Sequence, residues 1–101
     1  DGKLTHEGDY KEGNEDGKWI YYFPGGAKAE RVVHYKEGRL DGKMFLYNWR
    51  PYYVTTEIDY KDGLKHGKMF VYDKRGNVTV EKNFEEGIEV NENGKPVRFD
   101  P

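Results

Sequence analysis

Hydrophobic and polar residues alternate along most of the chain, and the alternation returns with a fixed period. Aromatic residues that open each unit stand at Tyr10, Tyr35, Tyr60 and Phe84, so the steps between them are 25, 25 and 24 residues. A fixed period of this length indicates a repeat array in which each unit contacts its neighbours. The predicted organisation of the single domain, 1–101, is a partial repeat (1–9), three repeats (10–34, 35–59 and 60–83), and a truncated repeat with a capping hairpin (84–101).

Each repeat is predicted to contribute two β-strands, because its apolar segments are rich in aromatic and β-branched residues. The first strands are expected at 18–23, 43–48 and 68–73. The second strands are expected at 29–36, 53–61 and 78–85. Glycine-containing segments such as Glu37-Gly38…Asp41-Gly42 separate them and predict tight turns, since glycine adopts positive φ angles without steric cost. No helix is predicted.

The two kinds of strand differ in how they alternate. In a second strand one phase is mostly apolar, as in Tyr60, Ile58, Thr56 and Val54, and the other is acidic or hydroxylated, which predicts a half-buried strand. The first strands are apolar in both phases. One row holds Ile20, Tyr22, Phe45, Tyr47, Phe70 and Tyr72, and the other holds Trp19, Tyr21, Met44, Leu46, Met69 and Val71. The predicted fold is all-β: a single-layer, elongated antiparallel β-meander of hairpin repeats, closed by a hairpin at 88–99.

Composition narrows the classes of function. Hydrophobic residues make up 35% of the chain and charged residues 36%, which is poor material for a thick core, while 16% aromatic residues argue against disorder. The net charge is −2 and no basic tract is present, so neither nucleic acid nor an anionic membrane is expected as a partner. No apolar segment is long enough to span a membrane, and no signal peptide is recognisable. The absence of cysteine excludes disulfides and leaves the compartment open, cytoplasmic or exported. Because the first unit begins in mid-repeat, a longer parent chain is expected.

The repeated pattern Tyr-x-x-Gly-x-x-x-Gly-Lys-(Trp/Met)-x-x-Tyr, at 10–22, 35–47 and 60–72, resembles a variant MORN repeat. It is most similar to the bacterial variants described as YwqK-type antitoxin proteins. The resemblance implies successive hairpins in one twisted sheet and a protein-interaction or scaffolding role, with a toxin as the partner of an antitoxin. The second repeat departs from the pattern at Asn48–Tyr53, where its neighbours have a glycine turn.

A second resemblance competes with the first. The segment 16–23 is similar to the aromatic hairpins of bacterial cell-wall-binding repeats of the choline-binding type, which implies a glycan or choline ligand. The Gly-Trp pair typical of those repeats is missing, and Met44 and Met69 replace Trp19 in the later units. Because of these departures, glycan or choline binding ranks second, as the alternative function.

Residues that break the repeat are the candidate binding residues, because the fold does not demand them. Trp19, Trp49, Tyr52 and Tyr53 are such breaks, and Trp and Tyr are favoured anchors at interfaces. The structural alternative is that the loop folds back and covers one end of an apolar row. The predicted binding surface for a protein partner, or for a second copy of the chain, comprises Trp19, Tyr21, Met44, Leu46, Trp49, Tyr52, Tyr53 and Met69.

Catalysis and metal binding are not predicted. Serine and cysteine are absent, and His6, His34 and His66 occupy non-equivalent positions in their repeats. No segment has EF-hand spacing or a phosphate-binding glycine loop before a helix. Acidic residues such as Glu57 and Asp59 leave a carboxylate enzyme as a further alternative, but a thin sheet rarely forms the enclosed pocket that such chemistry needs. Neither a cofactor nor a metal ion is expected.

Overall fold

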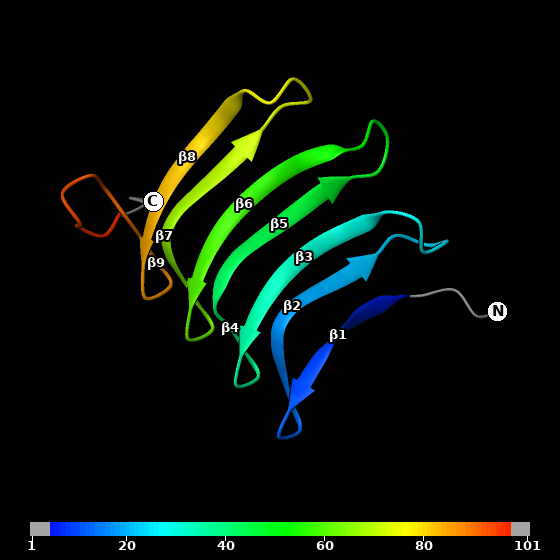
Figure 1. The fold of residues 1–101 in the computed structure, drawn as a ribbon. Coiled ribbons are helices and arrows are strands. Elements are labelled where there is room, and N and C mark those ends of the chain that lie inside the picture. Colours follow the sequence, from blue (N-terminus) through cyan, green and yellow to red (C-terminus); the bar gives the residue numbers. More distant parts are fainter. Residues whose placement is uncertain (1–4, 98–101) are drawn as a thin grey trace.

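The computed structural model describes residues 5–97 and shows one antiparallel sheet of nine strands (Figure 1). The strands are β1 (His6–Lys11), β2 (Asn14–Tyr22), β3 (Ala29–Lys36), β4 (Arg39–Leu40), β5 (Gly42–Asn48), β6 (Tyr53–Lys61), β7 (Leu64–Tyr72), β8 (Val78–Glu85) and β9 (Ile88–Val90). Their order across the sheet follows the chain, and the short β4 pairs with β3 beside β5. Within the described residues there is no helix. The predicted all-β meander is confirmed.

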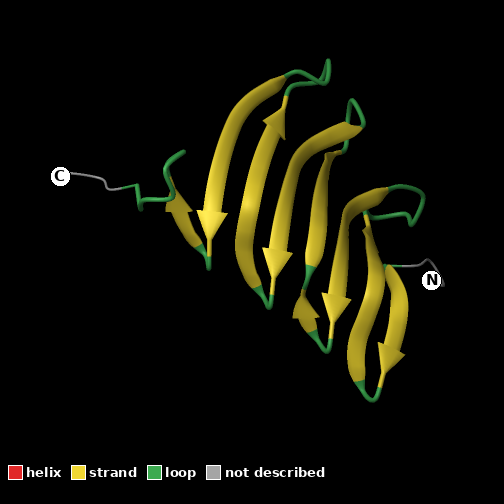
Figure 2. Cartoon of the chain, turned by 60° about the vertical axis from the view of Figure 1, so that its left-hand side comes forward, coloured by secondary structure: helices red, strands yellow, loops and turns green. Residues whose placement is uncertain are grey.

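The sheet is a single bent layer whose strands curve along their length (Figure 2). Its principal extents are 50 × 38 × 24 Å, and the radius of gyration is 15.6 Å. A compact domain of this length would have a radius of gyration of roughly 13 Å. The sheet is therefore extended, and each hairpin contacts mainly the hairpins before and after it, as a repeat array requires.

Two-residue turns join the second strand of each repeat to the strand that follows. At Glu37-Gly38 both residues have positive φ, 53° and 80°, and Asp62-Gly63 has the same geometry at 51° and 85°. Positive φ at both positions defines the type I′ turn, which matches the twist of paired strands. The following strands begin directly after these turns, at Asn14, Arg39 and Leu64. The predicted starts at 18 and 68 were therefore four residues too late, because Gly17 and Gly67 lie inside β2 and β7 and not in turns. The predicted start at 43 lies one residue after the first residue of β5, Gly42.

The cross-strand register assigns each first-strand row to its own face. Trp19 lies opposite Val33, while Met44 and Met69 both lie opposite Ile58. We call this side the Trp19 face. The opposite side, the Tyr47 face, carries Phe45, which lies opposite Val32 and Glu57. The two predicted rows are confirmed as the two faces of the sheet.

A β-bulge near the start of each second strand reverses the alternation there. Leu46 pairs with Thr56, but the next residue, Tyr47, pairs with Val54, so Thr55 is an extra residue on β6. Val54 therefore lies on the Tyr47 face, and the prediction that it shares a face with Tyr60 was wrong. A bulge adds one residue to one strand and so inverts the side-chain pattern beyond it. The same shift occurs at Ala29, opposite Tyr22, and at Val78, opposite Tyr72.

The core is thin and lies on both faces. On the Trp19 face the buried side chains are Trp19, Val33 and Ile58; the other two buried apolar residues among those described are Val32 and Val90. No polar or charged side chain is buried in residues 5–97. Most apolar residues are instead half-buried, so the sheet leaves apolar surface in contact with solvent.

The C-terminal end of the sheet is only partly covered. β9 pairs with residues 83–85 of β8, and the chain then turns through Asn91–Lys95 to a single bridge between Val90 and Pro96. The predicted closing hairpin is thus present in a short form, with residues 98 and 99 outside the described part. Among the described residues, none pairs with the first half of β8 on this side, so the capping hairpin covers only residues 83–85 of that strand. At the other end, residues 1–4 of the partial repeat are likewise not described.

Candidate functional site on the Tyr47 face

Five of the predicted binding residues share the Trp19 face: Trp19, Tyr21, Met44, Leu46 and Met69. Trp19 itself is only 3% exposed. Its indole N–H donates a hydrogen bond to the carbonyl oxygen of Asp9 at 3.0 Å, and its ring meets the rings of Tyr10 and Tyr35 edge-on. Most of Trp19 is therefore used in packing, and little of its surface is available to a partner.

The predicted turn residues lie elsewhere. The ring of Tyr52 stacks on Tyr47, with 5.2 Å between centroids and 5° between planes, and its hydroxyl donates to the carbonyl oxygen of Ala29 at 2.9 Å. Tyr47 lies on the face opposite to Leu46, since adjacent residues of a strand point to opposite sides. The structure therefore does not bring the eight predicted residues together on one surface, and the turn joins the Tyr47 face.

Trp49 and Tyr52 form an exposed aromatic cluster with the preceding turn. The Trp49 ring packs edge-on against Phe23, with 5.1 Å between centroids, and the Lys28 ammonium lies 5.0 Å from the Tyr52 centroid. We call Phe23, Lys28, Tyr47, Trp49 and Tyr52 the aromatic turn surface. Trp49 is 45% exposed and Tyr52 38% exposed, although both rings are held by neighbours from another hairpin. Exposure combined with fixed orientation suits a binding surface.

Phe23 and Lys28 belong to this surface, although neither is among the predicted binding residues. Both lie in an ordinary glycine turn, and nothing in their own segment marks them. Their position in the repeat is the signal that could have found them, because they stand 25 residues before Asn48 and Tyr53 in the aberrant turn. Turns one period apart are neighbours in a repeat array.

A hollow of about 380 Å³ lies beside the aromatic turn surface. Its walls are Phe45, Tyr53, Val54, Glu57 and Tyr72, and its rim is the turn Asp73, Lys74 and Gly76. We call it the Tyr72 hollow. The Tyr72 hydroxyl donates to a Glu57 carboxylate oxygen at 3.3 Å. Burial and the neighbouring Glu57 carboxylate raise the pKa of Tyr72 above its ordinary value, so the hydroxyl stays protonated and able to donate.

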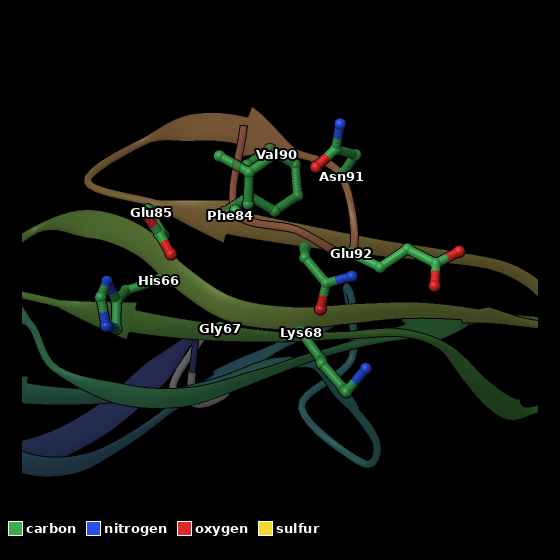
Figure 3. A pocket seen from close by; sticks show the side chains of 10 residues that line it. His66, Gly67, Lys68, Phe84, Glu85, Val90, Asn91 and Glu92 are labelled. Atoms are coloured by element: carbon green, nitrogen blue, oxygen red, sulfur yellow. The ribbon is translucent and has the colours of Figure 1, made fainter. Parts of the chain in front are cut away.

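A second hollow, of about 340 Å³, lies where β9 ends (Figure 3). His66 and Lys68 from β7, Glu85 from β8, and Val90 and Glu92 from β9 and its turn line it. The walls carry charges of both signs and no aromatic cluster. Among the described residues, no group of His, Asp or Glu side chains is arranged to hold a metal ion.

The three histidines do not converge. His6 stacks on Trp19, with 5.9 Å between ring centroids, and Nδ1 of His34 is hydrogen-bonded to the Lys43 carbonyl oxygen. His66 lines the hollow of Figure 3. The acidic residues Glu57 and Asp59 both pair with Lys43, at 3.1 and 3.4 Å. These carboxylates form ion pairs along a sheet surface.

Comparison of the chain with models of known protein families, with curated proteins and with solved structures finds no match. Residues 5–97 contain no helix of the length and apolarity needed to cross a membrane.

Proposed function

We propose that the chain is a non-enzymatic protein-interaction module and that the aromatic turn surface is where it contacts its partner. The observation that carries this proposal is that Trp49 and Tyr52 are exposed and at the same time fixed by Phe23 and Tyr47. A fixed aromatic side chain loses little conformational freedom on binding, so more of its contact energy is retained as affinity. Tryptophan and tyrosine also dominate the residues whose truncation weakens protein interfaces most.

The resemblance of the repeats to bacterial variant MORN repeats supports the same role. Under this proposal the sheet is a scaffold that presents side chains at its turn end, and an antitoxin-like chain would bind a toxin protein there. The turn that departs from the repeat, Asn48–Tyr53, then carries the specificity, because the repeat itself does not require its aromatic residues.

A glycan or choline ligand remains the second candidate, since stacked aromatic rings also bind sugars and quaternary ammonium groups. Lys28 argues for the protein partner, because its ammonium already lies over the Tyr52 ring where a ligand cation would bind. A catalytic role has less support than either, because Glu57 and Asp59 are engaged by Lys43.

The test is affinity capture from lysate of the source organism, with the intact chain and two variants as bait. We expect Trp49→Ala to lose a specific protein that the wild-type chain retains. Leu64→Ala is the matched control, because Leu64 is 49% exposed and follows a turn at the opposite end of the hairpins. Circular dichroism and thermal unfolding check that both variants are folded. Retention of polysaccharide without protein, or equal capture by all three chains, would contradict the proposal.

A further inference from the structure

The Tyr72 hollow and the place occupied by the Tyr52 ring are the same site in successive repeats. Tyr47 and Tyr72 are equivalent residues one period apart, and so are Ala29 and Val54. The register confirms the equivalence, since Tyr47 pairs with Val54 as Tyr22 pairs with Ala29. In one repeat the site is filled by a side chain of the protein itself. In the next repeat it is open.

The filled site shows how a tyrosine binds there. The Tyr52 ring lies flat on Tyr47, its hydroxyl donates to the Ala29 carbonyl oxygen at 2.9 Å, and the Lys28 ammonium lies over the ring. These contacts use a stacking surface, one backbone acceptor and one cation. The residues equivalent to Tyr47 and Ala29, which are Tyr72 and Val54, both line the open site.

The open site is empty because the turn above it differs. Between Tyr47 and Val54 there are six residues, but between Tyr72 and Val78 only five, and none of these five is aromatic. The Asp73 carboxylate accepts the backbone N–H groups of Arg75 and Asn77 at 2.9 Å, so this turn is folded on itself. The missing residue is also the reason for the single step of 24 in the repeat.

We propose that the Tyr72 hollow is a receptor for a tyrosine side chain of the partner protein, bound as Tyr52 is bound in the preceding repeat. The guest ring stacks on Tyr72, and its hydroxyl donates to the carbonyl oxygen of Val54. The inference rests on the proposed function for the class of partner, and it deepens that function by naming the residue that the partner inserts. The hollow adjoins the aromatic turn surface through Tyr53, so one partner segment can contact both.

The charges of the open site differ from those of the filled site. The position of Lys28 is taken by Tyr53, and the position of Val32 is taken by Glu57, whose carboxylate pairs with Lys43 at 3.1 Å. Lys74 lies at the rim of the hollow and supplies a cation there. The guest tyrosine therefore needs no charged neighbour of its own. The chain's own segment Asn48–Tyr53 carries the tyrosine that fills the equivalent site and is the natural probe.

The test is a nuclear magnetic resonance titration of the isotope-labelled full chain with an end-blocked peptide of the sequence Asn48–Tyr53. We expect amide shift changes confined to the walls of the hollow, at Val54, Glu57 and Tyr72 and their neighbours. A peptide with alanine in place of both tyrosines is expected to cause none. Shift changes at other places only, or equal changes with both peptides, would overturn the receptor assignment.

Two variants of the chain, titrated with the same peptide, show whether the shift changes arise from the hollow. Replacing 73–77 by the six-residue sequence of Asn48–Tyr53 should fill the hollow from within and abolish the shift changes. Tyr22→Ala, at the equivalent position of the first repeat, should leave them unchanged. Undiminished peptide binding by the grafted chain would overturn the proposal. Loss of the receptor assignment would leave capture through Trp49 untouched, so the two proposals fail separately.

Discussion

Gly8 of β1 lies directly against the indole ring of Trp19, and a methyl group placed on Gly8 would overlap that ring. Gly8 stands where Val33 and Ile58 stand in the later repeats, and Trp19 stands where Met44 and Met69 stand. Where the partial repeat meets the first full repeat, the largest side chain therefore packs against the smallest residue. The later repeats pair two side chains of intermediate size in the same space.

This relationship predicts strong coupling between the two positions. Gly8→Val should destabilise the protein by about 1–3 kcal/mol through overpacking, and Trp19→Met by about 2 kcal/mol through the cavity it leaves. The double variant rebuilds the combination of Val33 and Met44 found one period later, so it should be more stable than the sum of the single effects predicts by about 1–3 kcal/mol. Urea unfolding followed by circular dichroism measures all four chains. Strictly additive effects would show that the two residues do not share one space.

Much of the fold was predictable because the repeat shows each strand three times. The second strands at 29–36, 53–61 and 78–85 have the predicted bounds. The bulges could not be predicted, since an extra residue such as Thr55 leaves the composition of its strand unchanged. The first strands were predicted to start late because Gly17, Gly42 and Gly67 resemble turn residues, whereas in the structure they adopt positive φ in or beside paired strands.

The candidate site was predicted less completely than the fold. The aberrant turn was recognised, but its face depends on Tyr47, which was not among the predicted binding residues. Trp19 was predicted as a binding anchor because it breaks the repeat, and its burial depends on Gly8, which is distant from it in the sequence. The Tyr72 hollow results from a turn one residue shorter than its neighbours, and only the stacking of hairpins in space turns that difference into a cavity.

Alkaline pH is expected to destabilise the fold through Tyr35. Burial, and then the hydrogen bond with Tyr21, raise the pKa of Tyr35 to about 12. The pKa of a tyrosine in an unfolded chain is roughly 10. The neutral hydroxyl therefore contributes its full stability below roughly pH 10, and this contribution is lost as the pH rises toward the folded-state pKa of about 12. Tyr35→Phe should reduce the fall in unfolding free energy over this range.

Tyrosinate absorbance during an alkaline titration identifies the group directly. The highest titration step of the wild-type chain should be missing from Tyr35→Phe. The pKa of Tyr60 is also raised by burial, so Tyr60→Phe is the matched control and should keep the step that belongs to Tyr35. A Tyr35→Phe chain that titrates like the wild type would contradict the assignment.

Acid pH is expected to weaken the turn at Asp73. A hydrogen bond from the backbone N–H of Asn77 is the main reason why the pKa of this carboxyl lies below its ordinary value. Burial opposes this lowering, and a further hydrogen bond from the N–H of Arg75 adds to it. A lowered pKa contributes stability above the unfolded value, about 3.9, and the contribution is lost as the pH falls below it. Asp73→Asn should keep the turn and remove this loss, because an amide oxygen accepts the same bonds without titrating.

The chain provides an internal precedent for that substitution. The side-chain oxygen of Asn91 accepts the backbone N–H groups of Asn93 and Lys95 at 2.9 and 3.0 Å in a turn of the same pattern. Unfolding by urea between neutral and acid pH compares the wild-type chain with Asp73→Asn and Asp73→Ala. The alanine variant should be less stable at neutral pH. An unchanged acid dependence in the asparagine variant would show that the carboxyl of Asp73 does not contribute to it.

The two-residue turns also connect one hairpin to the next. The backbone N–H of Gly63 donates to the carbonyl oxygen of Leu40 at 2.8 Å, and Gly38 makes the equivalent bond to Glu15 at 3.0 Å. Because Gly63 has a φ of 85°, Gly63→Ala should cost about 1–2 kcal/mol through backbone strain, although no side chain obstructs a methyl group there. Asp62→Asn is the matched control and should be neutral or stabilising, because asparagine accepts positive φ more readily. Urea unfolding measures the free energy of unfolding of both variants. A large decrease in Asp62→Asn as well as in Gly63→Ala would contradict the strain explanation.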